Sequence, residues 1–316
     1  MLLLLQQIRK EEIMRKNSFF SPSRILVIAS HTFTQLVRMK VFYFLAVFAL
    51  LMIAASFFEM PYSRTTEDTA EQELIILKST AMGSMAMFSV LFAIAATALL
   101  IPKDLEDRTL YTILSKPVPR LDYLIGKLSG VLLLVVVSLL LMDGLLCLIL
   151  NYRTDGLLAV ELEKARVQGW PKEYIQMRHD SITQQGVTWD LHAGVAAIFF
   201  KATIMASIAL LISTFSSSTL FTIVISVVIY FVGHFTADAR NYWLHSHGSN
   251  VSQELKMASQ GVALIFPDFQ LYNIIDATIE GKTVSASIIK KLTVLTLFYT
   301  GIYSVLAWFT FRKKEF

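Results

Sequence analysis

Long apolar stretches separated by shorter polar segments dominate the pattern along this chain. A helix needs about 20 predominantly apolar residues to cross the roughly 30 Å hydrocarbon core of a bilayer. Six stretches reach or approach that length, at residues 41–58, 74–101, 128–150, 193–215, 219–235 and 288–311. The pattern therefore predicts an all-α, polytopic membrane protein with six transmembrane helices.

A second periodicity precedes the first predicted span. Apolar residues recur at helical spacing from Ile25 to Val37, with polar residues between them. This spacing is typical of an amphipathic helix lying in the membrane interface, and the alternative is a simple extension of the first span. We therefore divide the chain into a cytoplasmic N-terminus with an interfacial helix, residues 1–40, and a six-helix transmembrane domain, residues 41–316.

Two polar connections are too long to be simple turns. They cover residues 151–190 and 237–283, and each contains apolar residues at helical spacing, at 157–167 and at 253–265. Gly-Trp-Pro at 169–171 and Phe-Pro-Asp at 266–268 are typical helix breakers. The pattern thus predicts two helical outer loops.

Composition and charge fix the orientation. The 316 residues are 55% hydrophobic and only 16% charged, whereas about 25% is usual for a soluble domain. Basic residues gather before the first span, between the second and third, and in Arg312-Lys313-Lys314 after the last. The positive-inside rule places these segments and both termini in the cytoplasm, which predicts a multi-pass protein of the cytoplasmic (inner) membrane, surrounded by lipid. It also explains the net charge of +4 without a nucleic-acid partner.

The cytoplasmic segment between the second and third spans, residues 102–127, carries the most information. Acidic residues begin it, where the dipole of a short helix favours them. Pro117 and Pro119 end it, because neither can donate a backbone hydrogen bond. The apolar residues between them form one helical stripe: Leu105, Leu110, Ile113 and Leu114. Such a surface is typical of a docking element, and the alternative is a solvated connector.

The same segment contains a motif. An acid is followed by Arg-Thr-Leu at 108–110, Leu-Ser-Lys-Pro-Val-Pro-Arg at 114–120 and Tyr-Leu-Ile-Gly-Lys at 123–127. This pattern resembles the type-2 ATP-binding-cassette permeases. Within them it is most similar to the branch of multicopper-enzyme maturation, which includes the permease of nitrous-oxide-reductase assembly.

The resemblance implies a permease subunit that is not itself an enzyme. In this family the 102–127 segment forms a coupling helix that docks in a groove of a separate ATPase. The docking residues carried over to this chain are Glu106, Arg108, Thr109, Leu110, Leu114, Pro117 and Arg120. Two copies of the ATPase would bind ATP and Mg, and a second copy of this chain or a similar permease would complete a dimer. A periplasmic or other extracytoplasmic accessory protein is a further partner to consider. No phosphate-binding G-x-x-x-x-G-K-[ST] occurs, so we expect no cofactor on this chain.

Four ionisable residues fall inside the predicted spans: Lys78, Asp143, Lys201 and His234. Such residues are costly in a bilayer, so each is a candidate for function. Asp143 and Lys201 lie at similar predicted depth, which indicates an ion pair or a shared cavity, or a contact that only joins two helices. Lys78 and His234 are expected to reach the outer interface.

The remaining polar residues and methionines do not favour a metal site or another function. His245-Ser246-His247 lacks a third ligand, and Met82, Met85 and Met87 follow a pattern of helix packing, so the sequence predicts no metal site. An intramembrane enzyme or an ion-driven secondary transporter would use Asp143, Lys201 and His234. The chain shows no H-E-x-x-H motif and no repeated halves, which are typical of those classes.

Overall fold

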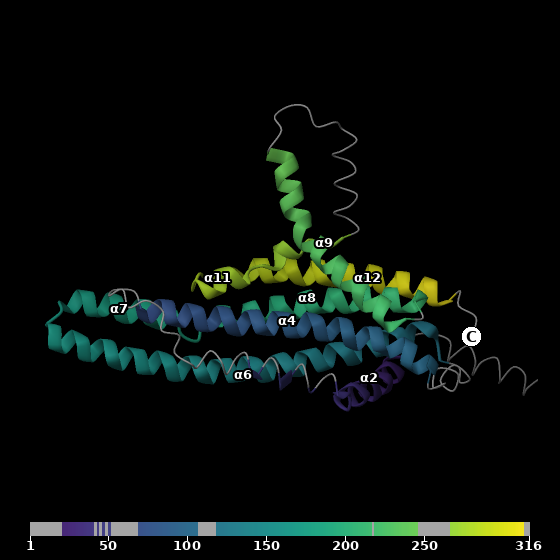
Figure 1. The fold of residues 1–316 in the computed structure, drawn as a ribbon, viewed down its shortest axis with the longest axis horizontal. Helices are drawn as coiled ribbons and strands as arrows, with labels where there is room; N and C mark the ends of the chain where they lie inside the picture. The colour runs from purple at the N-terminus through teal and green to yellow at the C-terminus, as the bar shows by residue number, and fades with distance from the viewer. Residues whose placement is uncertain are drawn as a thin grey trace, which may run out of the picture.

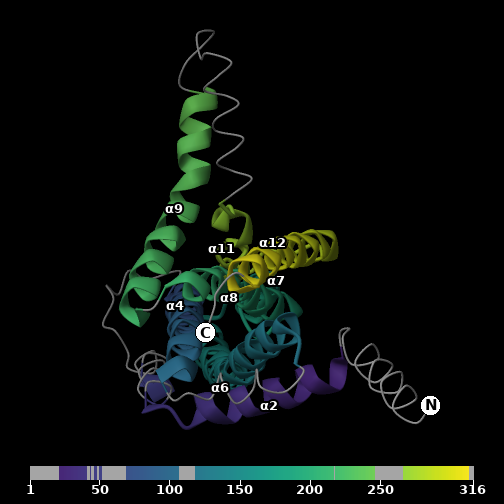
Figure 2. The same ribbon diagram turned by 90° about the vertical axis from the view of Figure 1, so that its right-hand side faces the viewer.

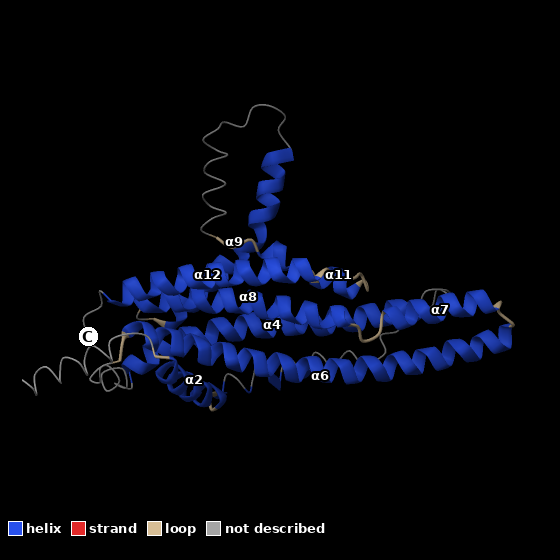
Figure 3. Cartoon of the chain, turned by 180° about the vertical axis from the view of Figure 1, so that it is seen from behind, coloured by secondary structure: helices blue, strands red, loops and turns tan. Residues whose placement is uncertain are grey.

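The computed structural model describes residues 21–40, 69–106, 118–216, 218–245 and 266–312, together with isolated helical positions between 43 and 51. Within this part of the chain every regular element is a helix and no strand occurs (Figure 3). The all-α prediction is therefore confirmed. The first predicted span, residues 41–58, lies largely outside the described residues, as does the predicted helix at 253–265.

Four described segments are long and apolar enough to cross a membrane. They belong to α4 (Thr69–Glu106), α6 (Arg120–Gln168), α8 (Trp189–Phe215) with α7 (Lys172–Gln184) before it, and α12 (Ala286–Arg312). These correspond to the second, third, fourth and sixth predicted spans. The fifth coincides with a shorter apolar segment, Thr219–Phe235, within α9 (Thr219–His245).

The long helices form one bundle around α8. Helix α8 packs against α4 on one side and α12 on the other, and α4 in turn packs against α6 (Figure 1). Most residues of α8 from Leu191 to Thr214 are buried and none is exposed. A helix that is apolar all round is stable only inside a bundle or a membrane, which explains why α8 lies at the centre. Helix α9 rises away from this bundle (Figures 1 and 2).

Helix α6 extends well beyond a membrane thickness. Its 49 residues span about 74 Å at 1.5 Å per residue, more than twice the hydrocarbon core. It ends at Gln168, where Gly169 takes the left-handed conformation with φ of 64°, and α7 then runs back beside it (Figure 1). The predicted separation of a span at 128–150 from a loop helix at 157–167 is therefore wrong. No proline interrupts residues 120–168, so the helix continues into the polar segment.

The bundle has two ends. The loop end is where α4 ends at Glu106 and α6 begins at Arg120, and the hairpin end is where α6 meets α7. The second predicted outer loop, 237–283, is also partly helical. Helix α9 continues to His245, and after residues 266–268 the chain forms the short helices η1 (Phe269–Tyr272) and α11 (Ile275–Ile279).

Helix α2 (Pro22–Val37) crosses the first turns of α6 at close range (Figure 2). It buries residues at helical spacing against α6: Ile25, Ala29, Thr32 and Leu36. Gly126 and Gly130 make this approach possible, because a Cβ added at Gly130 would lie 2.6 Å from Thr32 Cβ and 2.7 Å from the Ala29 carbonyl oxygen. Such small-xxx-small spacing is a usual device for close helix crossings. Helix α2 ends at Val37, where Arg38 is its C-cap residue.

Candidate functional site

Both ends of the 102–127 segment belong to long helices. Helix α4 continues through Pro102 to Glu106, and α6 already begins at Arg120. Residues 107–117 and the side chain of Glu106 lie outside the described structure. The same holds for most of the predicted docking residues: Arg108, Thr109, Leu110, Leu114 and Pro117. The structure does describe the two helix ends that hold this loop.

A buried polar cluster joins those two helix ends. Lys127 Nζ lies 2.6 Å from Asp104 Oδ2, and the two side chains are 1% and 5% exposed. Tyr123 Oη donates to the same carboxylate oxygen at 2.5 Å, and Lys127 Nζ also donates to Gln35 Oε1 at 3.3 Å. A buried ion pair persists only when additional hydrogen bonds satisfy its groups. We call these four residues the loop-end cluster, and it fixes α2, α4 and α6 at one point.

A second contact ties α2 to the start of α6. Asp122 Oδ2 accepts from Arg24 Nε at 3.1 Å and lies 3.0 Å from Arg24 Nη2. The same oxygen also accepts from the backbone N–H of Ser21 at 3.3 Å. A carboxylate is favourable at the positive end of a helix dipole. Asp122 lies in the first turn of α6 and next to the N-cap residue of α2, so it stabilises both helix starts.

Arg120 is the one predicted docking residue with a described side chain. It makes hydrogen bonds to backbone carbonyl groups of this chain. Its Nη1 donates to the carbonyl oxygens of Phe311 at 2.8 Å and of Arg312 at 2.7 Å. Basic side chains commonly satisfy the last carbonyls of a helix in this way. The ring of Phe311 stacks on Tyr123 of the loop-end cluster at a centroid distance of 5.9 Å. Arg120 thus joins the first turn of α6 to the last turn of α12.

Together these contacts join four helices next to the two ends of the undescribed residues 107–117. The two helices that the loop connects, α4 and α6, are fastened to each other, to α2 and to α12 within the last or first few turns at the loop end. Motif residues Tyr123 and Lys127 were visible in the sequence, whereas nothing marked Gln35 as a neighbour of Lys127 or Arg24 as a neighbour of Asp122.

The predicted contact between Asp143 and Lys201 is not formed. Asp143 Oδ2 accepts a hydrogen bond from His192 Nδ1 at 2.8 Å. Lys201 lies nine residues further along α8 than His192, which is about 14 Å along the helix. Asp143 and Lys201 are both buried, and the described contact of Asp143 is with His192.

The other two intramembrane residues also find partners. Lys78 is 2% exposed, so it does not extend to solvent as predicted. Its Nζ donates to Gln185 Oε1 at 2.5 Å and to the Thr278 carbonyl oxygen at 3.5 Å, joining α4 to the α7–α8 turn and α11. His234 is partly buried, with Nδ1 3.3 Å from the Tyr230 carbonyl oxygen. Both residues therefore serve packing in the described structure.

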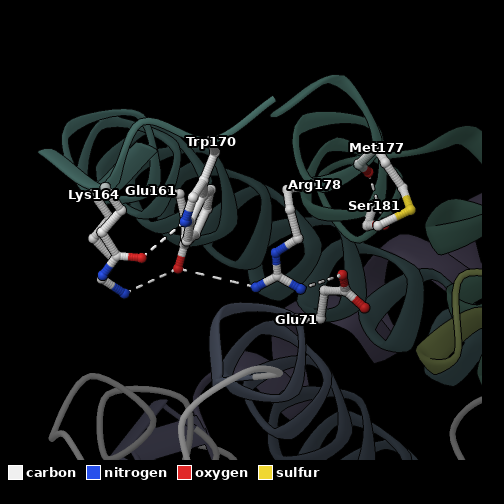
Figure 4. A network of polar contacts seen from close by, with 8 residues as sticks. Glu71, Glu161, Lys164, Trp170, Met177, Arg178 and Ser181 are labelled. Atoms are coloured by element: carbon white, nitrogen blue, oxygen red, sulfur yellow. Dashed lines mark hydrogen bonds and ion pairs between the residues drawn. The ribbon is translucent and has the colours of Figure 1, made fainter. Parts of the chain in front are cut away.

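The hairpin end is held by a separate ionic network (Figure 4). Arg178 of α7 lies between two carboxylates, with Nη1 3.3 Å from Glu71 Oε1 of α4 and Nη2 4.0 Å from Glu161 Oε1 of α6. Lys164 Nζ lies 3.0 Å from Glu161 Oε1. Exposed ion pairs contribute only about 0–1 kcal/mol, but the Arg178 side chain is 9% exposed. The network therefore fixes the α6–α7 hairpin to the start of α4.

Comparison with known proteins agrees with this architecture. The family model described as "ABC-2 family transporter protein" matches residues 26–315. The match begins inside α2 and continues through the loop-end cluster to the end of α12. No curated protein matches the chain.

Proposed function

Because the chain belongs to the ABC-2 family of transporter membrane subunits, we propose that its 102–127 segment couples ATP hydrolysis in a separate ATPase subunit to movement of a substrate across or within the membrane. The observation that supports this most directly is the loop-end cluster. The buried ion pair between Lys127 and Asp104 lies next to the segment whose apolar stripe and two prolines are typical of a docking element.

The cluster suits a segment that transmits force. Sliding α4 along α6 would separate Asp104 from Lys127, and breaking a buried pair costs about 3–5 kcal/mol. The helices therefore move together when the loop is displaced. Because α4 and α6 both run to the hairpin end, such a movement reaches the opposite side of the bundle.

The proposed complex contains two ATPase subunits, which bind ATP and Mg, and two permease subunits. An exposed face of α9 supports a helical partner: Phe221, Val224, Val228, Phe231 and Phe235 are 49–63% exposed and follow a spacing of three and four residues. That spacing suits packing against a second helix.

We further propose that both termini lie in the cytoplasm and that the membrane is the inner membrane. The motif at 108–127 supports placing the chain in the multicopper-enzyme maturation branch.

Leu114→Asp should abolish co-purification of the ATPase while leaving membrane insertion intact. An unpaired carboxylate in an apolar groove costs several kcal/mol, whereas Glu106→Ala removes only a rim contact worth about 0–1 kcal/mol. A pull-down from detergent, normalised to permease in the membrane fraction, compares the two variants. ATPase recovery at the wild-type level with Leu114→Asp would show that the segment is a connector.

Cysteine labelling tests the orientation with little background, since Cys147 is the only cysteine. In a Cys147→Ser background, Ser115→Cys should react with a membrane-impermeant maleimide only from the cytoplasmic side. Ser181→Cys, on α7 of the hairpin, should react only from the opposite side. Labelling of Ser115→Cys from outside would overturn both the orientation and the docking assignment.

A further inference from the structure

Three side chains with metal-binding atoms converge between α6 and α8. Asp143 and Cys147 lie one helical turn apart on α6, and His192 lies in the first turn of α8. One ligand atom from each lies within 4.8 Å of the others. Among the residues that the structure describes, no other group of three or more histidine, cysteine and acidic side chains is close enough to share an ion.

The aspartate of this group has unused bonding capacity. Asp143 is 8% exposed, and its Oδ1 is buried without a hydrogen-bond partner in the described structure. Its other oxygen accepts only from His192. Carboxylates within apolar helices are rare unless they pair or bind something. The unpartnered oxygen therefore points to a ligand with positive charge.

We propose that Asp143, Cys147 and His192 bind one Zn²⁺ ion. Thiolate sulfur, imidazole nitrogen and carboxylate oxygen are the three ligand types that Zn²⁺ takes in proteins. Mg²⁺ and Ca²⁺ prefer oxygen ligands alone. The charges also favour a divalent ion, because one thiolate and one carboxylate neutralise it in a place where a net charge is costly.

Three protein ligands leave the fourth tetrahedral position open. His192 is partly exposed, so the proposed site is open on that side. The ion would fasten α6 to the first turn of α8, 16 residues along α6 from Lys127, or about 24 Å. The site is thus separate from the loop-end cluster and does not depend on the coupling role proposed above.

Cobalt provides the sharpest test, because Co²⁺ bound to a thiolate absorbs by charge transfer and Cys147 is the only thiol in the chain. The full-length protein is purified in detergent, titrated with Co²⁺ and followed by absorption. We expect a thiolate band that saturates at one Co²⁺ per chain and disappears when Zn²⁺ is added. Cys147→Ser should lose the band completely. His192→Gln should weaken Zn²⁺ binding at least about tenfold, since losing even an outer-shell contact has that effect.

Two control variants keep the result specific. His179→Gln removes the exposed histidine beside Asp180, a similar acid–imidazole pair without a thiol, and should leave the band unchanged. The double variant His245→Ala/His247→Ala should leave it unchanged too. Gel filtration of the metal-free proteins confirms that Cys147→Ser and His192→Gln are folded. Absence of the thiolate band in the wild type, or unchanged Zn²⁺ affinity in both Cys147→Ser and His192→Gln, would overturn the proposal.

Discussion

Lys127→Met is expected to lower the free energy of unfolding by about 3–5 kcal/mol, the usual effect of breaking a buried ion pair from one side. Methionine keeps an unbranched side chain of nearly the same length but removes the charge that faces Asp104. The Asp104 side chain is 5% exposed, so its carboxylate would be left buried without the cation that compensates it. Denaturant unfolding in micelles measures the change.

A matched variant and a double variant make this prediction specific. Lys164→Met breaks an ion pair whose lysine is 46% exposed, so it should cost no more than about 1 kcal/mol. Asp104→Asn combined with Lys127→Met removes both charges and leaves an amide oxygen for Tyr123, so most of the stability should return. Equal losses for Lys127→Met and Lys164→Met would contradict the buried joint at the loop end.

The positions of the membrane helices were predictable because the length of an apolar run is a local property of the sequence. Helices α4, α6, α8 and α12 each contain a predicted span. The end of α6 was not predictable by the same measure. Polar residues after position 150 indicate that the chain leaves the bilayer, but they do not indicate that the helix ends. Gly169 and Pro171 indicate where the helix ends, and α6 does end at Gln168, just before them.

The partners of the buried charges depend on contacts between distant segments, which the sequence does not display. Counting residues from the ends of the predicted spans places Asp143 and Lys201 at similar depth. His192 lies one residue before the predicted span 193–215, so the same count does not place it inside the membrane. Helix α8 in fact begins at Trp189, and this places His192 opposite Asp143. An error of a few residues at one helix end thus hid the group with Cys147.

In the loop-end cluster, too, some residues are evident from the local sequence and others only from the fold. The motif at 123–127 marked Tyr123 and Lys127, because the residues themselves form the pattern. Their partner Asp104 lies in the same polar connection, at close sequence distance. Gln35, in contrast, reaches Lys127 only because α2 crosses α6 at Gly126 and Gly130. The sequence predicted the amphipathic helix, while the surface that it covers is a property of the fold.

Gly130→Leu should detach α2 from α6. A Cβ at this position would already lie 2.7 Å from the Ala29 carbonyl oxygen, and a backbone atom cannot rotate away as a side chain can. Overpacking of this kind usually costs about 1–3 kcal/mol, and here the closest relief is movement of the whole helix α2.

Hydrogen exchange read by mass spectrometry measures this detachment, because the amides of α2 should lose protection when the helix leaves its site. Gly144→Leu is the matched control on the same helix, since nothing lies within 4 Å of an added Cβ there, and α2 should stay protected in it. Movement of α2 also separates Gln35 from Lys127 and Arg24 from Asp122, so Gly130→Leu should weaken the joint at the loop end even though it changes no charged residue. Unchanged protection of α2 in Gly130→Leu would show that the crossing at Gly130 does not hold this helix in place.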